Sequence, residues 1–318
     1  MRPLTHIFAA ASVRPCSQAV LASSAAKSRN PLDLVKLTPL MKLSSGRAET
    51  TIALIDGPVA TDHQDLSGTN IREIPGRLGG TCARANSIAC MHGTFVAGIL
   101  SARRTSCAPS IAPDCTLLVR PIFAEIASRN RDMPSATPDE LATAIIDCVD
   151  ANADVINLSA ALVQPSIKGV HRLSEALDYS AKRGVLIVAA AGNQGTIGSS
   201  VITRHHWVIP VVACDLGGKS IDYSNLGNSI GRRGLSAPGD GINSLGAGGE
   251  SQTFGGTSAA APFVTGALAL LKSIFSDATA TELKIVLTQG ERLRRPGVAP
   301  PLLDAWGAYG RLASARSR

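Results

Sequence analysis

The segment Thr51-Ile52-Ala53-Leu54-Ile55-Asp56-Gly57 has the length and the apolar run of a buried β-strand, and it ends in a carboxylate. Similar apolar runs cover residues 117–123, 155–158, 185–190 and 207–213. Helical patterns alternate with them, at residues 93–100, 138–149, 170–182 and 258–272, with Thr137 as the predicted cap before Pro138. Apolar strands joined by helical crossovers indicate a parallel sheet covered on both faces. We therefore predict an α/β fold of three α/β/α layers with a mainly parallel central sheet.

The length and composition favour one large folded domain. The chain has 318 residues, of which 45% are hydrophobic and 17% charged, enough to bury a sizeable core. No repeat or linker divides it, and we predict a domain at residues 46–312. Residues 1–45 are predicted to be a largely disordered leader, with a transit-type presequence as the alternative, because the first thirty are rich in Ala, Ser and Arg and lack acids. Residues 313–318 are predicted to be a basic tail.

The net charge of +7 does not indicate a nucleic-acid partner, because it lies at the ends of the chain. Residues 1–32 carry four basic and no acidic residues, and residues 291–318 carry six arginines against two acids. Aromatic residues make up only 3% of the sequence, whereas nucleic-acid binders show a basic face, often with stacking aromatics. The apolar stretches, such as residues 263–271, are too short for a membrane span. We predict neither partner.

Polar residues that could carry chemistry follow two of the predicted strands. Asp56 ends one strand and Asn193 follows another, so both are expected at the sheet edge where ligands of α/β proteins bind. His92 begins the small-residue segment His92-Gly93-Thr94-Phe95, and Ser258 lies in Gly255-Gly256-Thr257-Ser258-Ala259-Ala260-Ala261-Pro262. Taken singly, each has a structural explanation, as a turn residue, a hydrogen-bonded histidine or a helix cap.

Together these segments resemble the subtilisin-type serine peptidases, whose triad runs in the order Asp, His, Ser. Val188-Ala189-Ala190-Ala191-Gly192-Asn193 is similar to the segment that supplies the oxyanion-hole asparagine of that family, and the likeness runs from about residue 51 to 312. The resemblance implies that Ser258 is the nucleophile, His92 the general base and Asp56 the residue that orients it. It also implies that Asn193 and the backbone N–H of Ser258 stabilise the oxyanion.

The resemblance extends to the substrate groove. Asn157-Leu158-Ser159-Ala160-Ala161-Leu162 is similar to the strand that pairs with the substrate backbone, where many members carry glycines in place of the two alanines. The alanines either narrow the groove or simply pack well. The substrate-binding residues implied in this way are Ser159, Ala160, Ala161 and Gly192.

Two departures from the usual motifs favour a subgroup. Gly57 stands where Ser or Thr commonly follows the aspartate, and Phe95 replaces the second histidine of a His-Gly-Thr-His pattern. The combination is similar to the patellamide-type (cyanobactin) maturation proteases, as are Cys90, Ala112-Pro113-Asp114-Cys115 and Pro121-Ile122-Phe123. We expect a serine endopeptidase that processes a specific ribosomal peptide precursor. The alternatives are a broad degradative protease, a non-catalytic peptide-binding homologue, and acyl transfer to an amine.

The cysteines leave two possibilities open. Four of the seven lie within residues 82–115, and two disulfides among Cys82, Cys90, Cys107 and Cys115 are favoured over reduced thiols, with no pairing assigned. Cys148 and Cys214 are predicted to be buried thiols. No cofactor and no metal are predicted, because the nearest calcium candidate, residues 62–65, is better explained as a solvated turn. The peptide or protein substrate is the expected partner; a cytoplasmic location is favoured over secretion or an organelle, and the oligomeric state is left open.

Overall fold

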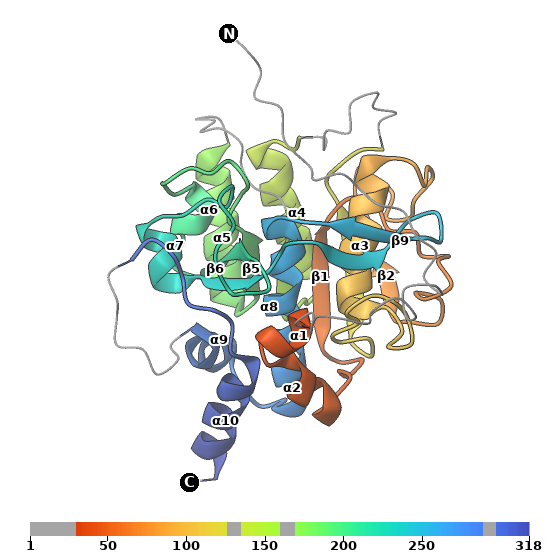
Figure 1. The fold of residues 1–318 in the computed structure, drawn as a ribbon. Coiled ribbons are helices and arrows are strands. Elements are labelled where there is room, and N and C mark those ends of the chain that lie inside the picture. Colours follow the sequence, from red (N-terminus) through yellow and green to blue (C-terminus); the bar gives the residue numbers. More distant parts are fainter. Residues whose placement is uncertain (1–29, 126–134, 160–168, 289–296, 318) are drawn as a thin grey trace.

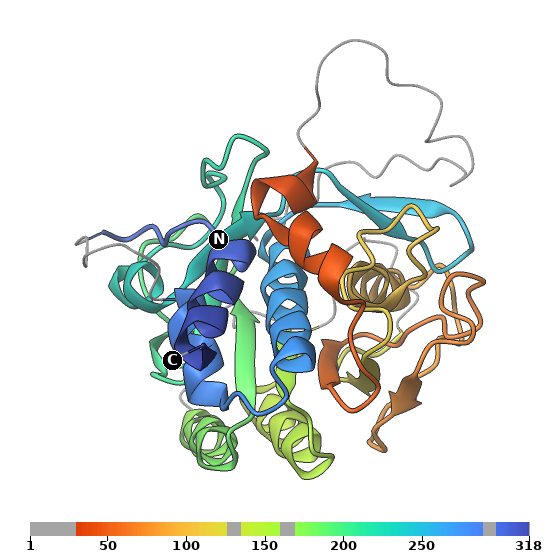
Figure 2. The same ribbon diagram turned by 90° about the horizontal axis from the view of Figure 1, so that it is seen from below.

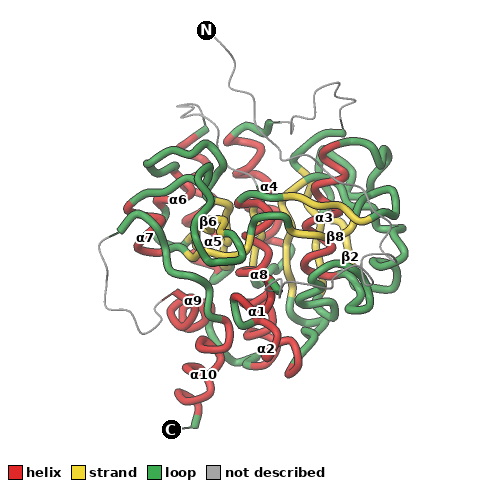
Figure 3. The backbone as a smooth tube through the Cα atoms, viewed as in Figure 1, coloured by secondary structure: helices red, strands yellow, loops and turns green. Residues whose placement is uncertain are grey.

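A seven-stranded sheet lies at the centre of the protein (Figures 1 and 3). The computed structural model describes residues 30–125, 135–159, 169–288 and 297–317. The strand order is β2-β3-β1-β4-β5-β6-β7, and all neighbouring strands are parallel. The strands are β1 (Thr51–Asp56), β2 (Ile71–Glu73), β3 (Thr116–Pro121), β4 (Val155–Leu158), β5 (Leu186–Ala190), β6 (Val208–Cys214) and β7 (Leu235–Pro238). The predicted parallel α/β sheet is confirmed.

Helices cover both faces of this sheet (Figure 2). One face packs against α3 (Ile88–Ser101) and α8 (Thr257–Ile274), and the other against α4 (Pro138–Asp150) and α5 (Val170–Arg183). A separate antiparallel hairpin, β8 (Ile242–Leu245) and β9 (Ser251–Phe254), leads directly into α8. The remaining helices are α1 (Pro31–Leu34), α2 (Leu37–Leu43), α6 (Val201–Arg204), α7 (Asn228–Arg233), α9 (Ala280–Thr288) and α10 (Ala305–Arg316).

Local sequence explains where α4 begins. The Thr137 side chain accepts a hydrogen bond from the Glu140 backbone, Glu140 returns one to the Thr137 backbone, and Pro138 occupies the first turn. This is a complete capping box, which satisfies two backbone donors that a helix start leaves free. The predicted cap at Thr137 is therefore confirmed.

Helix α8 is the central helix of the domain and contacts β4, β5, β6 and β7. Its small residues, including Ala259, Ala260 and Ala261, let it lie close to the sheet and are fully buried. By length and composition α8 would also qualify as a membrane span, but 83% of it is buried inside the domain. Burial of this kind is what a core helix shows.

Parts of the predicted leader and of the predicted tail are helical. Residues 30–45, assigned to a disordered leader, contain α1 and α2. Val35 between the two helices and Leu37 and Leu40 of α2 are wholly buried in the same core as α8. Residues 1–29 lie outside the described residues. Helix α10 runs to Arg316, which forms an ion pair with Asp277, so residues 313–316 of the predicted basic tail are helical.

Burial of α2 predicts a measurable contribution to stability. Leu40 is wholly buried, so Leu40→Ala should lower the free energy of unfolding in urea by about 2–5 kcal/mol. Leu43, on the same helix, is 53% exposed, and Leu43→Ala should change it by less than about 0.5 kcal/mol. Equal unfolding midpoints for the two variants would contradict the placement of α2 in the core.

Candidate active site

Three side chains from three elements form one hydrogen-bonded line at the carboxyl edge of the sheet. Asp56 is the last residue of β1, His92 lies near the start of α3, and Ser258 is the second residue of α8. His92 Nδ1 lies 2.8 Å from Asp56 Oδ1, and His92 Nε2 lies 3.0 Å from Ser258 Oγ. All three are at least nine-tenths buried. A hydroxyl beside an imidazole that a carboxylate orients can lose its proton to that imidazole and act as a nucleophile.

Asp56 and His92 approach each other because glycine backbones lie between their elements. A Cβ atom at Gly57 would lie 2.0 Å from the carbonyl oxygen of Ala89, and one at Gly93 would lie 2.4 Å from that of Pro58. The turn after β1 therefore packs backbone to backbone against α3. This contact explains why Gly57 stands where the motif usually carries Ser or Thr, since a side chain there would push α3 away from β1.

Asn193 faces the start of α8 from the loop after β5. Its Oδ1 accepts hydrogen bonds from the Thr257 backbone N–H, at 2.9 Å, and from the Thr257 hydroxyl, at 3.0 Å. The Asn193 Nδ2 lies beside Gly256, where a Cβ would come within 2.8 Å of it. Because Thr257 occupies the oxygen, the amide N–H group is left to donate to a bound group next to Ser258.

Thr257 and Phe254 belong to the site although the sequence analysis assigned neither a role. The Thr257 hydroxyl also accepts a hydrogen bond from the Gly192 backbone N–H at 3.1 Å, so it joins the loop after β5 to α8. The Phe254 ring lies 6.0 Å from the His92 ring and packs edge-on against Phe95 at 5.0 Å. The position of Thr257 directly before Ser258 could have indicated its role from the sequence. Phe254 precedes the glycine turn, and no sequence motif indicated that it lies beside His92.

The predicted substrate-binding residues are only partly described. Gly192 has a φ of 106°, in the region that favours glycine, and it lies next to Asn193 in the loop after β5. Ser159 directly follows β4 and is 8% exposed. Ala160 and Ala161 lie outside the described residues, so the expectation about their methyl groups stays a prediction.

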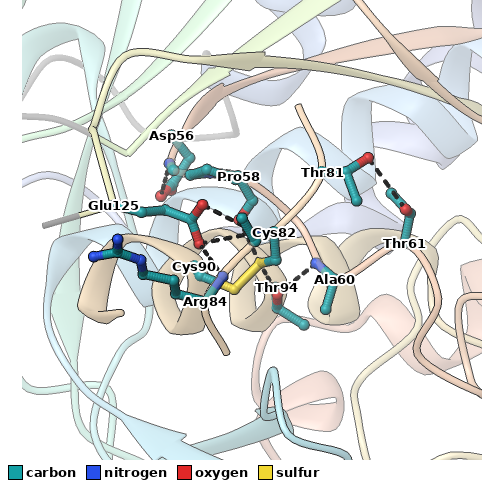
Figure 4. Close-up of a disulfide and its surroundings, with 12 residues drawn as sticks. Asp56, Pro58, Ala60, Thr61, Thr81, Cys82, Arg84, Cys90, Thr94 and Glu125 are labelled. Atoms are coloured by element: carbon teal, nitrogen blue, oxygen red, sulfur yellow. Dashed lines mark hydrogen bonds between the residues drawn. A yellow bond between two sulfur atoms is a disulfide. The ribbon is translucent and has the colours of Figure 1, made fainter. Parts of the chain in front are cut away.

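A disulfide joins the start of α3 to the preceding loop (Figure 4). Cys82 and Cys90 are bonded, with their Cα atoms 5.6 Å apart, two residues before His92. The carboxylate of Glu125 accepts hydrogen bonds from the backbone N–H groups of Ala83 and Arg84, at 3.0 and 2.8 Å, which fixes the loop beside the disulfide.

The states of Cys107 and Cys115 correct the prediction of two disulfides among the four clustered cysteines. Cys107 is also disulfide-bonded, but Cys115 is a free buried thiol, so the four do not form two bridges among themselves. Cys115 packs beside Gly46 and lies 3.7 Å from the Ser273 hydroxyl, and its burial raises the pKa of the thiol. Cys148 and Cys214 are buried free thiols, as predicted.

Metal-ligating side chains come together at one place in the described residues, and the chemistry there does not suit an ion. Cys82, Cys90 and Glu125 lie close enough to share one, but both sulfur atoms are held in the disulfide and Glu125 accepts backbone hydrogen bonds. Residues 62–65 form a turn in which His63 Nδ1 accepts a hydrogen bond from the Asp65 N–H. That the protein needs no metal or cofactor stays a prediction.

Comparison with known proteins identifies the family. The sequence profile of the Subtilase family matches residues 47–298. This chain belongs to the subtilase family. Its members are serine peptidases, which are hydrolases. The major intracellular serine protease of Bacillus subtilis is 31% identical over 233 residues, which are 70% of this chain and 68% of that protein.

Two solved structures are similar in fold and are 27–30% identical to this chain in sequence. A mutant of the protease domain of PatA matches with a TM-score of 0.76 and 30% identity, over 85% of this subtilase and 97% of that chain. The prenylagaramide maturation protease PagA matches with a TM-score of 0.74 and 27% identity, over 87% and 98%. This subtilase spans about half the length of the first curated relative that it matches, the thermostable alkaline protease of Halalkalibacterium halodurans, at 31% identity.

The contact between the β1 turn and α3 predicts the effect of a single methyl group. Gly57→Ala would place its Cβ against the Ala89 carbonyl and separate Asp56 from His92, and a displacement near 1 Å typically lowers catalytic rates about 10²-fold. The measurement is kcat on a peptide substrate. Gly79→Ala is the matched control, because no atom lies within 4 Å of a Cβ at Gly79. Equal activity of the two variants would refute the packing argument.

The Cys82–Cys90 disulfide predicts that the stability losses of its two single variants do not add in the double variant. It closes a loop with a sequence separation of 8, which in the chain-entropy model contributes about 2–3 kcal/mol. Cys82→Ser and Cys90→Ser each remove the whole cross-link, so the double variant should unfold in urea close to the less stable single variant. Additive losses would instead indicate two independent thiols.

Proposed function

We propose that this subtilase is a serine endopeptidase that hydrolyses peptide bonds through Asp56, His92 and Ser258. The observation that carries the proposal is the pair of hydrogen bonds through the two nitrogens of one buried imidazole. His92 would take the proton of Ser258 as its Oγ attacks the carbonyl carbon, and would return it to the leaving amine. Asp56 would hold the imidazole in the tautomer that accepts this proton. Water would then hydrolyse the acyl-enzyme.

The oxyanion of the tetrahedral intermediate would be stabilised by Asn193 Nδ2 and by the backbone N–H of Ser258. Thr257 supports this role, because it holds the opposite end of the Asn193 amide. Ser258 also lies at the start of α8, where the helix dipole favours developing negative charge. Pro262 has no N–H and stands four residues after Ser258, so the Ser258 carbonyl receives no helical hydrogen bond from that position.

The substrate we propose is one peptide precursor rather than proteins in general. Support comes from the two similar structures that are 27–30% identical, which are named as the patellamide maturation protease PatA and the prenylagaramide maturation protease PagA. The departures at Gly57 and Phe95 also fit the subgroup that the sequence resembles. Gly192 and Ser159 would line the groove. Ala189, Ala190 and Gly192 would border the first specificity pocket, and none of them is charged, so they do not indicate a preference for a charged residue before the scissile bond.

The function is tested in two stages. A fluorophosphonate probe should label the wild-type protein at Ser258, and Ser258→Ala should abolish labelling and turnover while the fold is retained. Adding His92→Ala should then cost little more, because triad residues act as a unit. Absence of labelling in the folded wild type would indicate a non-catalytic peptide-binding homologue.

The second stage separates processing from degradation. Digestion of a random peptide library, followed by mass spectrometry, should show cleavage at a restricted set of sequences, and denatured casein should stay largely intact. Extensive digestion of casein would support the broad degradative alternative. Head-to-tail joined products in the same spectra would indicate acyl transfer to an amine rather than hydrolysis.

The oxyanion role predicts a kinetic signature. Asn193→Ala should lower kcat by about 10²–10³, a magnitude carried over from subtilisin, with little change in KM. The reason is that the amide bonds more strongly to the oxyanion than to the substrate carbonyl. Circular dichroism should confirm an unchanged fold. A variant impaired mainly in KM would assign Asn193 to substrate binding instead.

A further inference from the structure

Four positively charged side chains gather near the ends of α6, α7 and α9 and have no carboxylate partner. Arg204 is the last residue of α6, Arg232 and Arg233 are the last two of α7, and Lys284 lies on α9. We call these four residues the basic patch; the three helices lie on the left of the view in Figure 1. None of the four forms an ion pair with any residue that the structure describes. Their charge is therefore available to an anion.

Hydrogen bonds hold two of these side chains against the same short stretch of backbone. Arg233 Nη2 donates to the Arg204 carbonyl at 2.7 Å and to the Thr203 carbonyl at 3.4 Å. Lys284 Nζ donates to the His206 carbonyl. The three carbonyl groups follow one another at the end of α6, so they bring the positive charges of α7 and α9 to one place.

These backbone contacts leave donors of the basic patch unused. Arg233 Nε is buried and has no hydrogen-bond partner among the described residues, although buried N–H groups are nearly always paired. Lys284 has three N–H donors, and besides its bond to the His206 carbonyl its Nζ lies 5.0 Å from the centre of the Trp207 ring. The unused donors suit an oxygen anion such as a carboxylate or a phosphate.

The charges of the basic patch also repel one another. Burial and the nearby charge of Arg233 lower the pKa of Lys284 to about 8. Burial and the charge of Arg232 lower the pKa of Arg233. The Asp178 carboxylate lies in this region but contacts His205 Nε2, at 3.1 Å, and none of the four patch residues. A bound anion would relieve this repulsion.

The basic patch lies at the opposite edge of the sheet from the triad. Trp207 directly precedes β6, and Arg233 lies two residues before β7, whereas Asp56 is the last residue of β1. The strands are parallel, and the seven residues of β6 at about 3.3 Å each separate the two edges by about 20 Å. A group bound at the patch therefore takes no part in bond cleavage, but it can hold a distant part of a bound chain.

We propose that the basic patch binds an acidic segment of the peptide substrate, outside the catalytic site. The inference rests on the proposed function and names a second feature of the substrate. Carboxylates spaced along a peptide match charges that are spread over three helices. A nucleic acid fits less well, because Lys284 covers a face of the Trp207 ring on which a base would stack. An extended residue spans about 3.4 Å, so at least about six residues must separate the acidic segment from the scissile bond.

The first test measures the binding of fluorescein-labelled hexaglutamate to the full chain carrying Ser258→Ala, which cannot cleave the probe. Binding should be saturable at about 0.01 M salt and weaken steeply towards about 0.15 M, because salt screens exposed charges. Arg232→Glu and Lys284→Gln should each weaken it about tenfold, as expected for a lost hydrogen bond to a charged group. Lys284→Arg, which keeps the charge, should retain binding. Arg232 is exposed and makes no hydrogen bond to a described residue, so its variant should fold.

The matched control is Lys42→Glu, which changes the net charge by the same amount as Arg232→Glu. Lys42 is exposed in the last turn of α2, as Arg232 is in the last turn of α7. The control should bind hexaglutamate as tightly as the parent chain. Fluorescein-labelled hexalysine should not bind to either.

The second test measures cleavage by the wild type. A peptide that is cut in the library digestion is extended at either end by hexaglutamate, through a Gly/Ser linker of about three or about fifteen residues. The longer linker should lower KM about tenfold at an unchanged kcat, because tethering raises the local concentration of the scissile bond. The shorter linker cannot span the distance between the two edges and should change neither constant. Arg232→Glu should remove the gain and leave cleavage of the unextended peptide unchanged.

Three outcomes would overturn the proposal. Equal losses of hexaglutamate binding in Lys42→Glu and Arg232→Glu would show attraction to the net charge of the chain rather than to the patch. Binding of inorganic phosphate or oligothymidylate at the patch without binding of hexaglutamate would exclude an acidic peptide as its ligand. Equal KM values for the two linkers would show that the patch does not capture the substrate. A wild type that the fluorophosphonate does not label would instead refute the peptidase function alone, because hexaglutamate binding is measured without turnover.

Discussion

The whole site depends on one close contact between two backbones. The turn at Gly57 and Pro58 lies against α3 at Ala89 and Gly93, at separations that admit no Cβ atom on either glycine. This contact sets the distance between β1 and α3, and with it the 2.8 Å between Asp56 and His92. A hydrogen bond between two buried side chains tolerates only small errors in distance. Gly57 and Gly93 allow the two backbones to approach closely enough for this bond, and a residue with a Cβ atom would hold them apart.

Helix α8 carries the other half of this arrangement. Ser258 reaches His92 on α3, Thr257 reaches Asn193 after β5, and Thr265 reaches Asn157 on β4. Each bond links α8 to a different element, so Ser258, Thr257 and Thr265 hold His92, Asn193 and Asn157 against one rigid support. The alanines of α8 make this possible, because they let a helix that carries these three hydrogen-bonding side chains lie directly on the sheet.

Sequence reasoning succeeded where the information is local or lies in a distinctive motif. The apolar runs predicted the strands, Thr137 predicted the start of α4, and the Asp, His and Ser segments predicted the side chains that meet. It failed where contacts between distant residues decide. Residues 31–43 show only a weak helical pattern, and the helices are stable because Leu37 and Leu40 pack against the core. Cys115 has neighbours in sequence that suggested a bridge, yet it lies beside Ser273 of α8.

The departure at Phe95 shows how a changed motif can keep its geometry. Phe95 is wholly buried and packs edge-on against Phe254, which precedes the turn into α8 and lies beside His92. The two rings therefore connect α3 to the β8–β9 hairpin on one side of the imidazole. The Cys82–Cys90 disulfide ties the same helix two residues before His92. With both nitrogens of His92 bonded, the ring has little freedom left, which preserves the orientation that the proposed proton transfer from Ser258 requires.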